Sequence, residues 1–222
     1  MATLFLLGDS TCAVKDASAR PETGWGEMFQ PYLADGWLLD NMALNGRSTE
    51  MILLEGVFYD CFWKAQKGDW VLIQFGHNEN KPEVFRYTDP DGSFRRNLCY
   101  MIDNLSKKGV SVILASSISR RNFQNGVAVN THFGYPEAME AVAREKGIPF
   151  LEMTQRTLAI LNRMGEEKSL EWFMNFPAGV YENYPNGKSD NTHLRPEGAR
   201  AIARLVYEAM GDYDLPFLRK GL

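Results

Sequence analysis

Short runs of apolar residues alternate along the chain with longer segments of helical character. The short runs are bounded by turn residues or charges and are too brief for a lone helix, which is typical of buried strands. They predict strands over residues 3–7, 37–42, 70–75, 111–115 and 149–152. The longer segments predict helices over residues 24–33, 49–64, 93–107, 135–146, 154–164 and 195–210.

This alternation of strands and helices predicts a parallel sheet with helices on both faces. We expect an α/β fold, a three-layer α/β/α sandwich around a flavodoxin-like parallel sheet of about five strands. The length fits one domain over residues 1–222. The longest irregular stretches are residues 76–92 and 165–192, and loops of this length are usually functional. Ligands bind at the carboxyl ends of strands in such sheets, so polar residues there are the candidates.

Composition narrows the function classes. The 222 residues carry a net charge of -4 and are 45% hydrophobic and 23% charged, which is ordinary for a globular protein. Without a strongly basic balance, nucleic acid is not expected as a partner. No apolar run approaches the ~20 residues of a membrane span, so no membrane partner is expected either.

The cysteines and the N-terminal sequence indicate in which cellular compartment the protein is expected. Cys12, Cys61 and Cys99 are widely spaced and form no CxxC pair, so neither a disulfide framework nor a zinc site is indicated. The N-terminal apolar run is short and lacks a basic region, which indicates a strand rather than a signal peptide. We expect a cytoplasmic protein, although a secreted chain trimmed of its signal peptide would look the same.

The first of four polar blocks is GDST, residues 8–11, directly after the first predicted strand. A serine there projects its hydroxyl from the sheet edge, and its backbone N–H is free to meet an anion. The block alone is also explained by Asp9 or Ser10 capping a helix. The tetrapeptide by itself favours the cap.

The next two blocks offer hydrogen-bond donors. The block NGRST, residues 45–49, follows the second strand, and its glycine lets the backbone approach a ligand closely. The block QFGHNEN, residues 74–80, follows the third strand, and its asparagine amide can donate to a developing oxyanion. Taken singly, they also read as a glycine turn with a Ser/Thr cap and as a solvated turn.

The fourth block, DNTH at residues 190–193, offers a general base. The histidines of the chain are His77, His132 and His193, and His193 alone has an aspartate three residues earlier. Asp190 can then reach the imidazole Nδ1–H, fix the tautomer and stabilise the imidazolium. The alternative is a surface aspartate beside a helix-entry histidine. Four such blocks in this order at strand ends favour a catalytic site.

Together the blocks resemble the SGNH hydrolases, also called GDSL esterases, and are most similar to the rhamnogalacturonan acetylesterase branch. That branch has GDST, then NGR or AGRS, then FGHN, then DxTH. This sequence has GDST at residues 8–11, NGRS at 45–48, FGHN at 75–78 and DNTH at 190–193. The combination of FGHN with DxTH is specific. Glu79 departs from the branch, which usually has aspartate after FGHN. The Ser, Gly, Asn and His that give the SGNH family its name are all present.

The resemblance implies roles for individual residues. Ser10 would be the nucleophile, His193 the general base and then acid, and Asp190 the residue that orients His193. The backbone N–H groups of Ser10 and Gly46 and the side-chain amide of Asn78 would form the oxyanion hole. Neither a metal nor another cofactor is implied.

The resemblance also implies a substrate, a small acetylated carbohydrate of the pectic, rhamnogalacturonan type. Among candidate substrate contacts, His77 is expected to be a structural or substrate-wall residue rather than the base. Trp172 belongs to an aromatic stretch before the fourth block, although large aromatic rings are mostly buried. Arg47, Arg120 and Arg121 follow strands, and any one of them can pair with a galacturonate carboxylate.

Two other function classes stay open. One is a general short-chain acyl-ester or thioester hydrolase of the same fold, and the other is a binding module that has lost activity. The complete set of Ser10, Asp190 and His193 argues against the binding module. The sequence has no long apolar lid to shelter an acyl chain, which argues against a lipid-like substrate. The sugar, the acetylated hydroxyl and the oligomeric state are not indicated.

Overall fold

A five-stranded sheet forms the centre of the computed structural model, which describes residues 2–221. The strand order is β2-β1-β3-β4-β7, and every neighbouring pair is parallel. This is the flavodoxin-like order, and the predicted α/β fold is confirmed. The strands are β1 (Ala2–Gly8), β2 (Trp37–Asn41), β3 (Trp70–Gln74), β4 (Ser111–Ala115) and β7 (Phe150–Leu151).

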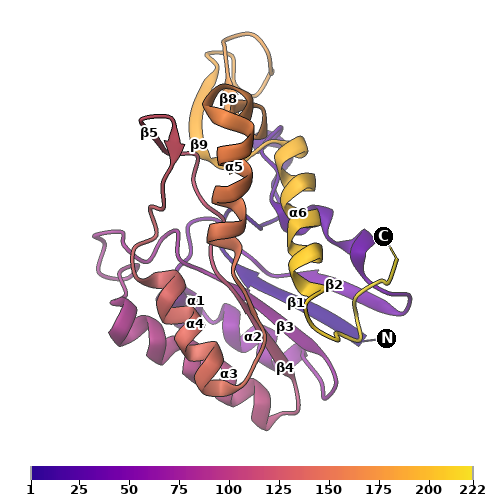
Figure 1. Ribbon diagram of the computed structural model, residues 1–222. Helices are drawn as coiled ribbons and strands as arrows, with labels where there is room; N and C mark the ends of the chain where they lie inside the picture. Colours follow the sequence, from indigo (N-terminus) through magenta and orange to yellow (C-terminus); the bar gives the residue numbers. More distant parts are fainter. Residues whose placement is uncertain (1, 222) are drawn as a thin grey trace.

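Two hydrophobic cores lie on the two faces of this sheet. In β1, Leu4 and Leu6 face one core, and Phe5 and Leu7 face the other, because side chains alternate along a strand. The first face is covered by α5 and α6, and the second by the remaining four helices (Figure 1). The helices are α1 (Thr49–Leu54), α2 (Val57–Lys64), α3 (Arg95–Lys107), α4 (Tyr135–Lys146), α5 (Met153–Ser169) and α6 (Pro196–Met210).

Three helices have bounds that differ from those predicted from the apolar pattern. The helix predicted over residues 49–64 is split into α1 and α2, because Gly56 has a φ of +85°, which a right-handed helix cannot contain. The helix predicted over residues 154–164 continues beyond Gly165, whose φ of +79° marks a kink inside α5. The helix predicted over residues 93–107 starts at Arg95, after a single π-helical turn at Pro90–Phe94.

The helix predicted over residues 24–33 is wrong. The segment forms two short 3₁₀ turns, Trp25–Met28 and Gln30–Tyr32, and Pro31 has no N–H to continue a helix. Gly24 packs directly on the loop that follows β1, so closely that a Cβ there would overlap the backbone of Ala13. This close approach fixes the segment against the loop that carries Ser10. Further 3₁₀ turns lie at Ala17–Ala19 and Leu170–Trp172.

The described residues contain four short strands that the sequence did not predict. Strand β8 (Phe173–Phe176) pairs antiparallel with β9 (Lys188–Leu194), and a smaller hairpin joins β5 (Phe123–Gln124) to β6 (Val127–Ala128). The block at residues 190–193 therefore lies on a strand, where a loop was expected. Within residues 2–221, no helix combines the length and apolar character needed to cross a membrane.

Candidate active site

The carboxyl ends of β2, β1 and β3 bring the first three polar blocks together. Gly8 of β1 pairs with Gln74 of β3, and the backbone N–H of Leu44 donates to the carbonyl of Gly8 at 3.1 Å. The residues that follow these three positions therefore leave the sheet side by side. They carry Ser10, Gly46 and Asn78.

Ser10, His193 and Asp190 form a continuous hydrogen-bonded chain. The imidazole Nε2 of His193 lies 3.0 Å from Ser10 Oγ, and its Nδ1 lies 2.7 Å from Asp190 Oδ2. A neutral imidazole protonated on Nδ1 donates to the carboxylate and accepts the serine O–H through Nε2. The three residues that the sequence selected are thus brought together in the order that serine activation requires.

The backbone holds the Asp190 carboxylate in place. Its Oδ1 accepts hydrogen bonds from the N–H groups of Thr192 at 2.8 Å and His193 at 3.0 Å. Burial acts to raise the pKa of Asp190, but the hydrogen bond and charge of His193 and these N–H groups outweigh it. The pKa of Asp190 is therefore held below its ordinary value, and the carboxylate stays ionised beside His193.

A rigid turn, with no helix after it, presents Ser10. The buried Asp9 accepts hydrogen bonds through Oδ1 from the Thr11 N–H at 2.9 Å and the Thr11 hydroxyl at 2.7 Å. Gln74 of β3 donates to the same Thr11 hydroxyl at 2.9 Å, and Trp25 donates to Gln74 at 2.9 Å. Asp9 therefore shapes the Ser10 turn through an Asx-type bond and does not cap a helix.

The second and third blocks meet through the Asn78 side chain. Asn78 Nδ2 donates to the carbonyl of Arg47 at 3.0 Å, directly beside Gly46. An amide nitrogen has two N–H groups, so one stays available for a ligand. Gly46 has a φ of +75°, in the region that favours glycine. Asn78 and Gly46 are thus held next to each other beside the Ser10 turn.

Glu79 fastens these two loops together. Its buried carboxylate accepts hydrogen bonds from the N–H groups of Thr49 at 2.9 Å, Gly76 at 2.9 Å and Asn78 at 3.1 Å. Burial raises the pKa of Glu79 to about 8, and the N–H donors act against that rise. The residue that departs from the family pattern therefore ties the start of α1 to the loop that carries Asn78.

His77, in the third block, has a buried ring. Its ring stands edge-on to His132, with ring centroids 4.4 Å apart. Neither ring nitrogen of His77 has a hydrogen-bond partner among residues 2–221. Burial, with the nearby charges of His132 and Arg120, lowers the pKa of His77 well below its ordinary value. A neutral, enclosed ring of this kind is a structural residue rather than a base.

The three arginines proposed from the sequence are occupied within the protein. Arg47 pairs with Glu55 at 2.8 Å and donates to the Asn45 carbonyl at 2.9 Å. Arg120 donates to the His77 carbonyl at 2.9 Å and to Thr131 at 3.0 Å. Arg121 donates to the Glu166 carbonyl, to Ser169 and to Asn191. Their side chains position loops and strands of the protein itself.

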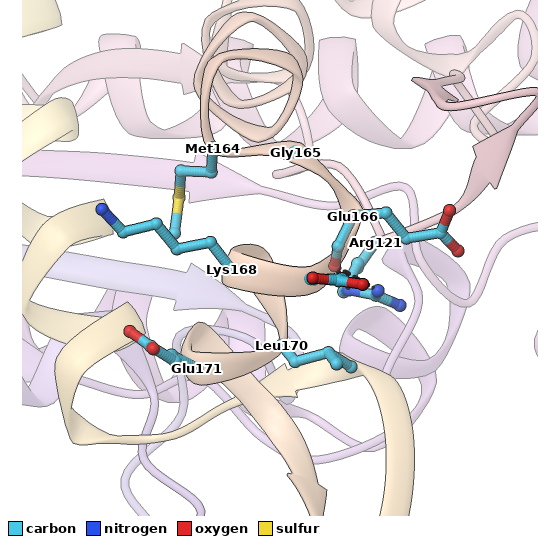
Figure 2. Close-up of a pocket in the computed structure, with 8 residues that line it drawn as sticks. Arg121, Met164, Gly165, Glu166, Lys168, Leu170 and Glu171 are labelled. Atoms are coloured by element: carbon cyan, nitrogen blue, oxygen red, sulfur yellow. Dashed lines mark hydrogen bonds between the residues drawn. The ribbon is translucent and has the colours of Figure 1, made fainter.

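Arg121 lines a surface pocket at the kink of α5, with a volume of about 930 Å³ (Figure 2). The Arg121 N–H also donates to the Asn191 carbonyl of β9 at 2.8 Å. Asn175 of β8 donates to the Asp190 carbonyl at 2.9 Å. This pocket therefore lies beside Arg121, one of the residues that hold β9 in place. Ser10 is not among the residues that line it. Its other lining residues are Met164, Gly165, Glu166, Glu167, Lys168, Leu170 and Glu171.

Trp172, a candidate substrate contact, packs between α5 and α6. It lines a groove between α5 and α6 together with Ile160 and Leu205, and packs against the hydrophobic core. A Cβ on Gly198 of α6 would come within 2.9 Å of Trp172 Cβ, so the two segments touch. This packing favours the core role that is typical of a large aromatic ring. Within the described chain, no cluster of three His, Cys, Asp or Glu residues has the geometry of a metal site.

The parallel α/β sheet and the hydrogen-bonded Ser10, His193 and Asp190 have the arrangement that is typical of serine hydrolases. Residues 6–201 match the model of the GDSL-like lipase/acylhydrolase family, and the chain belongs to that family. The predicted family resemblance is confirmed.

Three known proteins illustrate the similarity. The chain is 36% identical to rhamnogalacturonan acetylesterase RhgT of Bacillus subtilis (strain 168), over 96% of this chain and 91% of the relative. It is 27% identical to the rhamnogalacturonan acetylesterase of Emericella nidulans, over 94% of this chain and 84% of the relative. The crystal structure of protein YXIM of Bacillus subtilis superposes with a TM-score of 0.82 at 23% identity, over 95% of this chain. This chain spans 56% of that longer protein.

Proposed function

We propose that the protein is a serine esterase that removes acetyl groups from acetylated carbohydrate of the pectic, rhamnogalacturonan type. The observation that carries the proposal is the hydrogen-bonded chain from Ser10 Oγ through His193 to Asp190, with distances of 3.0 Å and 2.7 Å. The choice of an acetyl group and of a carbohydrate rests on the two relatives that are named rhamnogalacturonan acetylesterase.

In the first half of the reaction, Ser10 Oγ attacks the carbonyl carbon of the acetyl ester. Its proton passes to His193 Nε2, and the ionised Asp190 stabilises the imidazolium that forms. The tetrahedral oxyanion accepts hydrogen bonds from the N–H groups of Ser10 and Gly46 and from the Asn78 amide. The bond to the sugar oxygen then breaks, and His193 returns its proton to that oxygen.

The second half repeats these steps with water. His193 takes a proton from the water molecule, whose oxygen attacks the acetyl carbonyl on Ser10. The same three donors hold the second oxyanion. Collapse of this intermediate breaks the bond to Ser10 Oγ, and His193 protonates that oxygen as acetate leaves. The protein returns to its starting state without a cofactor in the cycle.

The test is a comparison of two substrate series. One series is acetylated rhamnogalacturonan oligosaccharides, assayed by acetate release, and the other is p-nitrophenyl acetate, butyrate and octanoate. We expect acetate release from the oligosaccharides and a fall in kcat/KM from the acetate to the octanoate ester. A preference for octanoate, with no release from the oligosaccharides, would favour the alternative, a general acyl-ester or thioester hydrolase.

A further inference from the structure

A single guanidinium faces the backbone of Gly46, and it belongs to Arg86. A Cβ built on Gly46 would lie 3.5 Å from Arg86 Nη2 and 4.0 Å from its Cζ, and apart from Gly46 and its two chain neighbours no other described residue has an atom within 4 Å. Gly46 carries one of the proposed oxyanion donors. Arg86 therefore lies at the edge of the position that the ester would occupy.

The backbone fixes the place of Arg86 in its loop. The Arg86 N–H donates to the Glu83 carbonyl at 2.8 Å, and the Thr88 N–H donates to the Glu79 carbonyl at 3.0 Å. The hydroxyl of Tyr135, on α4, donates to the Thr88 carbonyl at 2.8 Å. The loop is thus attached at its base to Glu79 and to α4, and the arginine leaves it from a defined position.

The Arg86 guanidinium lacks the partners that other cations near the site have. Its Nε is buried and has no hydrogen-bond partner within residues 2–221. Its nearest acid is Glu83, 3.9 Å from Nη1, beyond hydrogen-bond distance and largely exposed to solvent. An ion pair of this kind contributes little. By contrast, Arg47 is paired with Glu55 at 2.8 Å and Lys15 with Glu22 at 2.8 Å.

We propose that Arg86 binds a carboxylate of the substrate, the uronate group of a galacturonate unit. The proposal rests on the proposed function, because it assigns the recognition of an acidic carbohydrate to the same site. A planar guanidinium with free N–H groups binds a carboxylate in a bidentate manner, with two parallel hydrogen bonds. A carboxylate in this place also satisfies the buried donor.

The neighbours of Arg86 in the loop suit a sugar chain. Val84, Phe85 and Tyr87 are large apolar side chains that are 91%, 53% and 50% exposed. Such a patch on a soluble protein marks a binding surface. The apolar faces of sugar rings can lie on this patch while their carboxylates meet Arg86. This loop, rather than Trp172, is then the carbohydrate wall of the site.

The test measures binding without turnover. Titration calorimetry compares trigalacturonate, which has no acetyl ester, with the neutral galactotriose, in which each carboxylate is replaced by a hydroxymethyl group. The proteins are the wild type, Arg86→Gln, Arg86→Lys and the control Arg95→Gln. Arg95 is matched to Arg86, since the two side chains are 31% and 30% exposed, but Arg95 is paired with Glu145 on the α3–α4 surface. Thermal unfolding shows that each variant is folded.

The wild type is expected to bind trigalacturonate roughly tenfold or more tightly than galactotriose, as a charge-assisted hydrogen bond would give. Arg86→Gln should lose this preference, Arg86→Lys should keep part of it, and Arg95→Gln should keep all of it. A wild type without preference, or an Arg86→Gln protein that retains it, overturns the proposal. Failure of the proposed function would appear separately, as no acetate release from acetylated oligosaccharides.

Discussion

The carboxylate of Glu79 reaches the backbone N–H of Thr49, 2.9 Å away, and so joins the loop that carries Asn78 to the start of α1. Its other oxygen accepts the N–H of Asn78 itself. Gly46 lies three residues before Thr49, so one side chain sets the spacing between two of the proposed oxyanion donors. The geometry that stabilises an oxyanion depends on such preorganisation.

Glu79→Gln is therefore expected to lower kcat for p-nitrophenyl acetate by roughly tenfold, with little change in KM. The new amide nitrogen would face backbone N–H groups, and one loop would lose its anchor. Glu79→Asp, with a shorter side chain, should lose part of the activity. Glu50→Gln is the control. Glu50 lies next to Thr49 in α1 but accepts a hydrogen bond from Asn97 of α3 instead of joining the two loops. An unchanged kcat in Glu79→Gln would show that the loops carrying Gly46 and Asn78 keep their spacing without the Glu79 carboxylate.

Stability is expected to fall in acid through His132. Burial and then the charge of Arg120 lower the pKa of His132 to about 4, against 6.5 in the unfolded chain. A depressed folded-state pKa gives a stabilising contribution that is complete above about pH 6.5 and is lost as the pH falls towards 4. The contribution lost between about pH 7 and pH 5 is about 2 kcal/mol.

Urea unfolding of the wild type and His132→Gln at these two pH values measures this contribution. The variant should show a weaker dependence of unfolding free energy on pH, by about 2 kcal/mol, whatever its stability at neutral pH. The remaining dependence belongs to other groups, including the buried His77, whose pKa is also lowered. Parallel curves for the two proteins would mean that His132 does not titrate as described.

Trp172→Ala is expected to act through stability. The ring packs between α5 and α6, and its loss from a half-buried position should lower the unfolding free energy by about 2 kcal/mol or more. At a temperature where the variant is folded, KM for acetylated oligosaccharides should stay within about twofold of wild type. A rise in KM for the oligosaccharides alone, with p-nitrophenyl acetate unaffected, would place Trp172 at the substrate after all.

The fold could be predicted wherever buried segments appear in the sequence as runs of apolar residues. The strands of a parallel sheet are buried on both faces, so each reads as an apolar run, and all five were found near their observed bounds. Strand β9 was missed because it is mostly polar: only its last residue, Leu194, lies in the core, and the rest is held by β8, Arg121 and Asn175. The segment at residues 24–33 was misassigned because its close contact with Ala13 is a tertiary feature.

The candidate site was predictable where residue types and spacing are specific. Ser10, Asp190 and His193 were selected from their blocks, and the structure brings them into hydrogen-bond contact. Arg86 has no such signal, because its position beside Gly46 depends on the path of a loop without periodic pattern. The cytoplasmic location stays a prediction.

The central claim is that the Ser10 hydroxyl is the nucleophile, and kcat/KM of Ser10→Ala tests it most directly. The variant removes one oxygen atom from a turn that Asp9, Thr11 and Gln74 hold in place, so its melting temperature should match that of the wild type. We predict that kcat/KM for acetate release from acetylated rhamnogalacturonan oligosaccharides falls by at least about a hundredfold. A folded Ser10→Ala protein that retains more than about one hundredth of the wild-type rate would contradict the account.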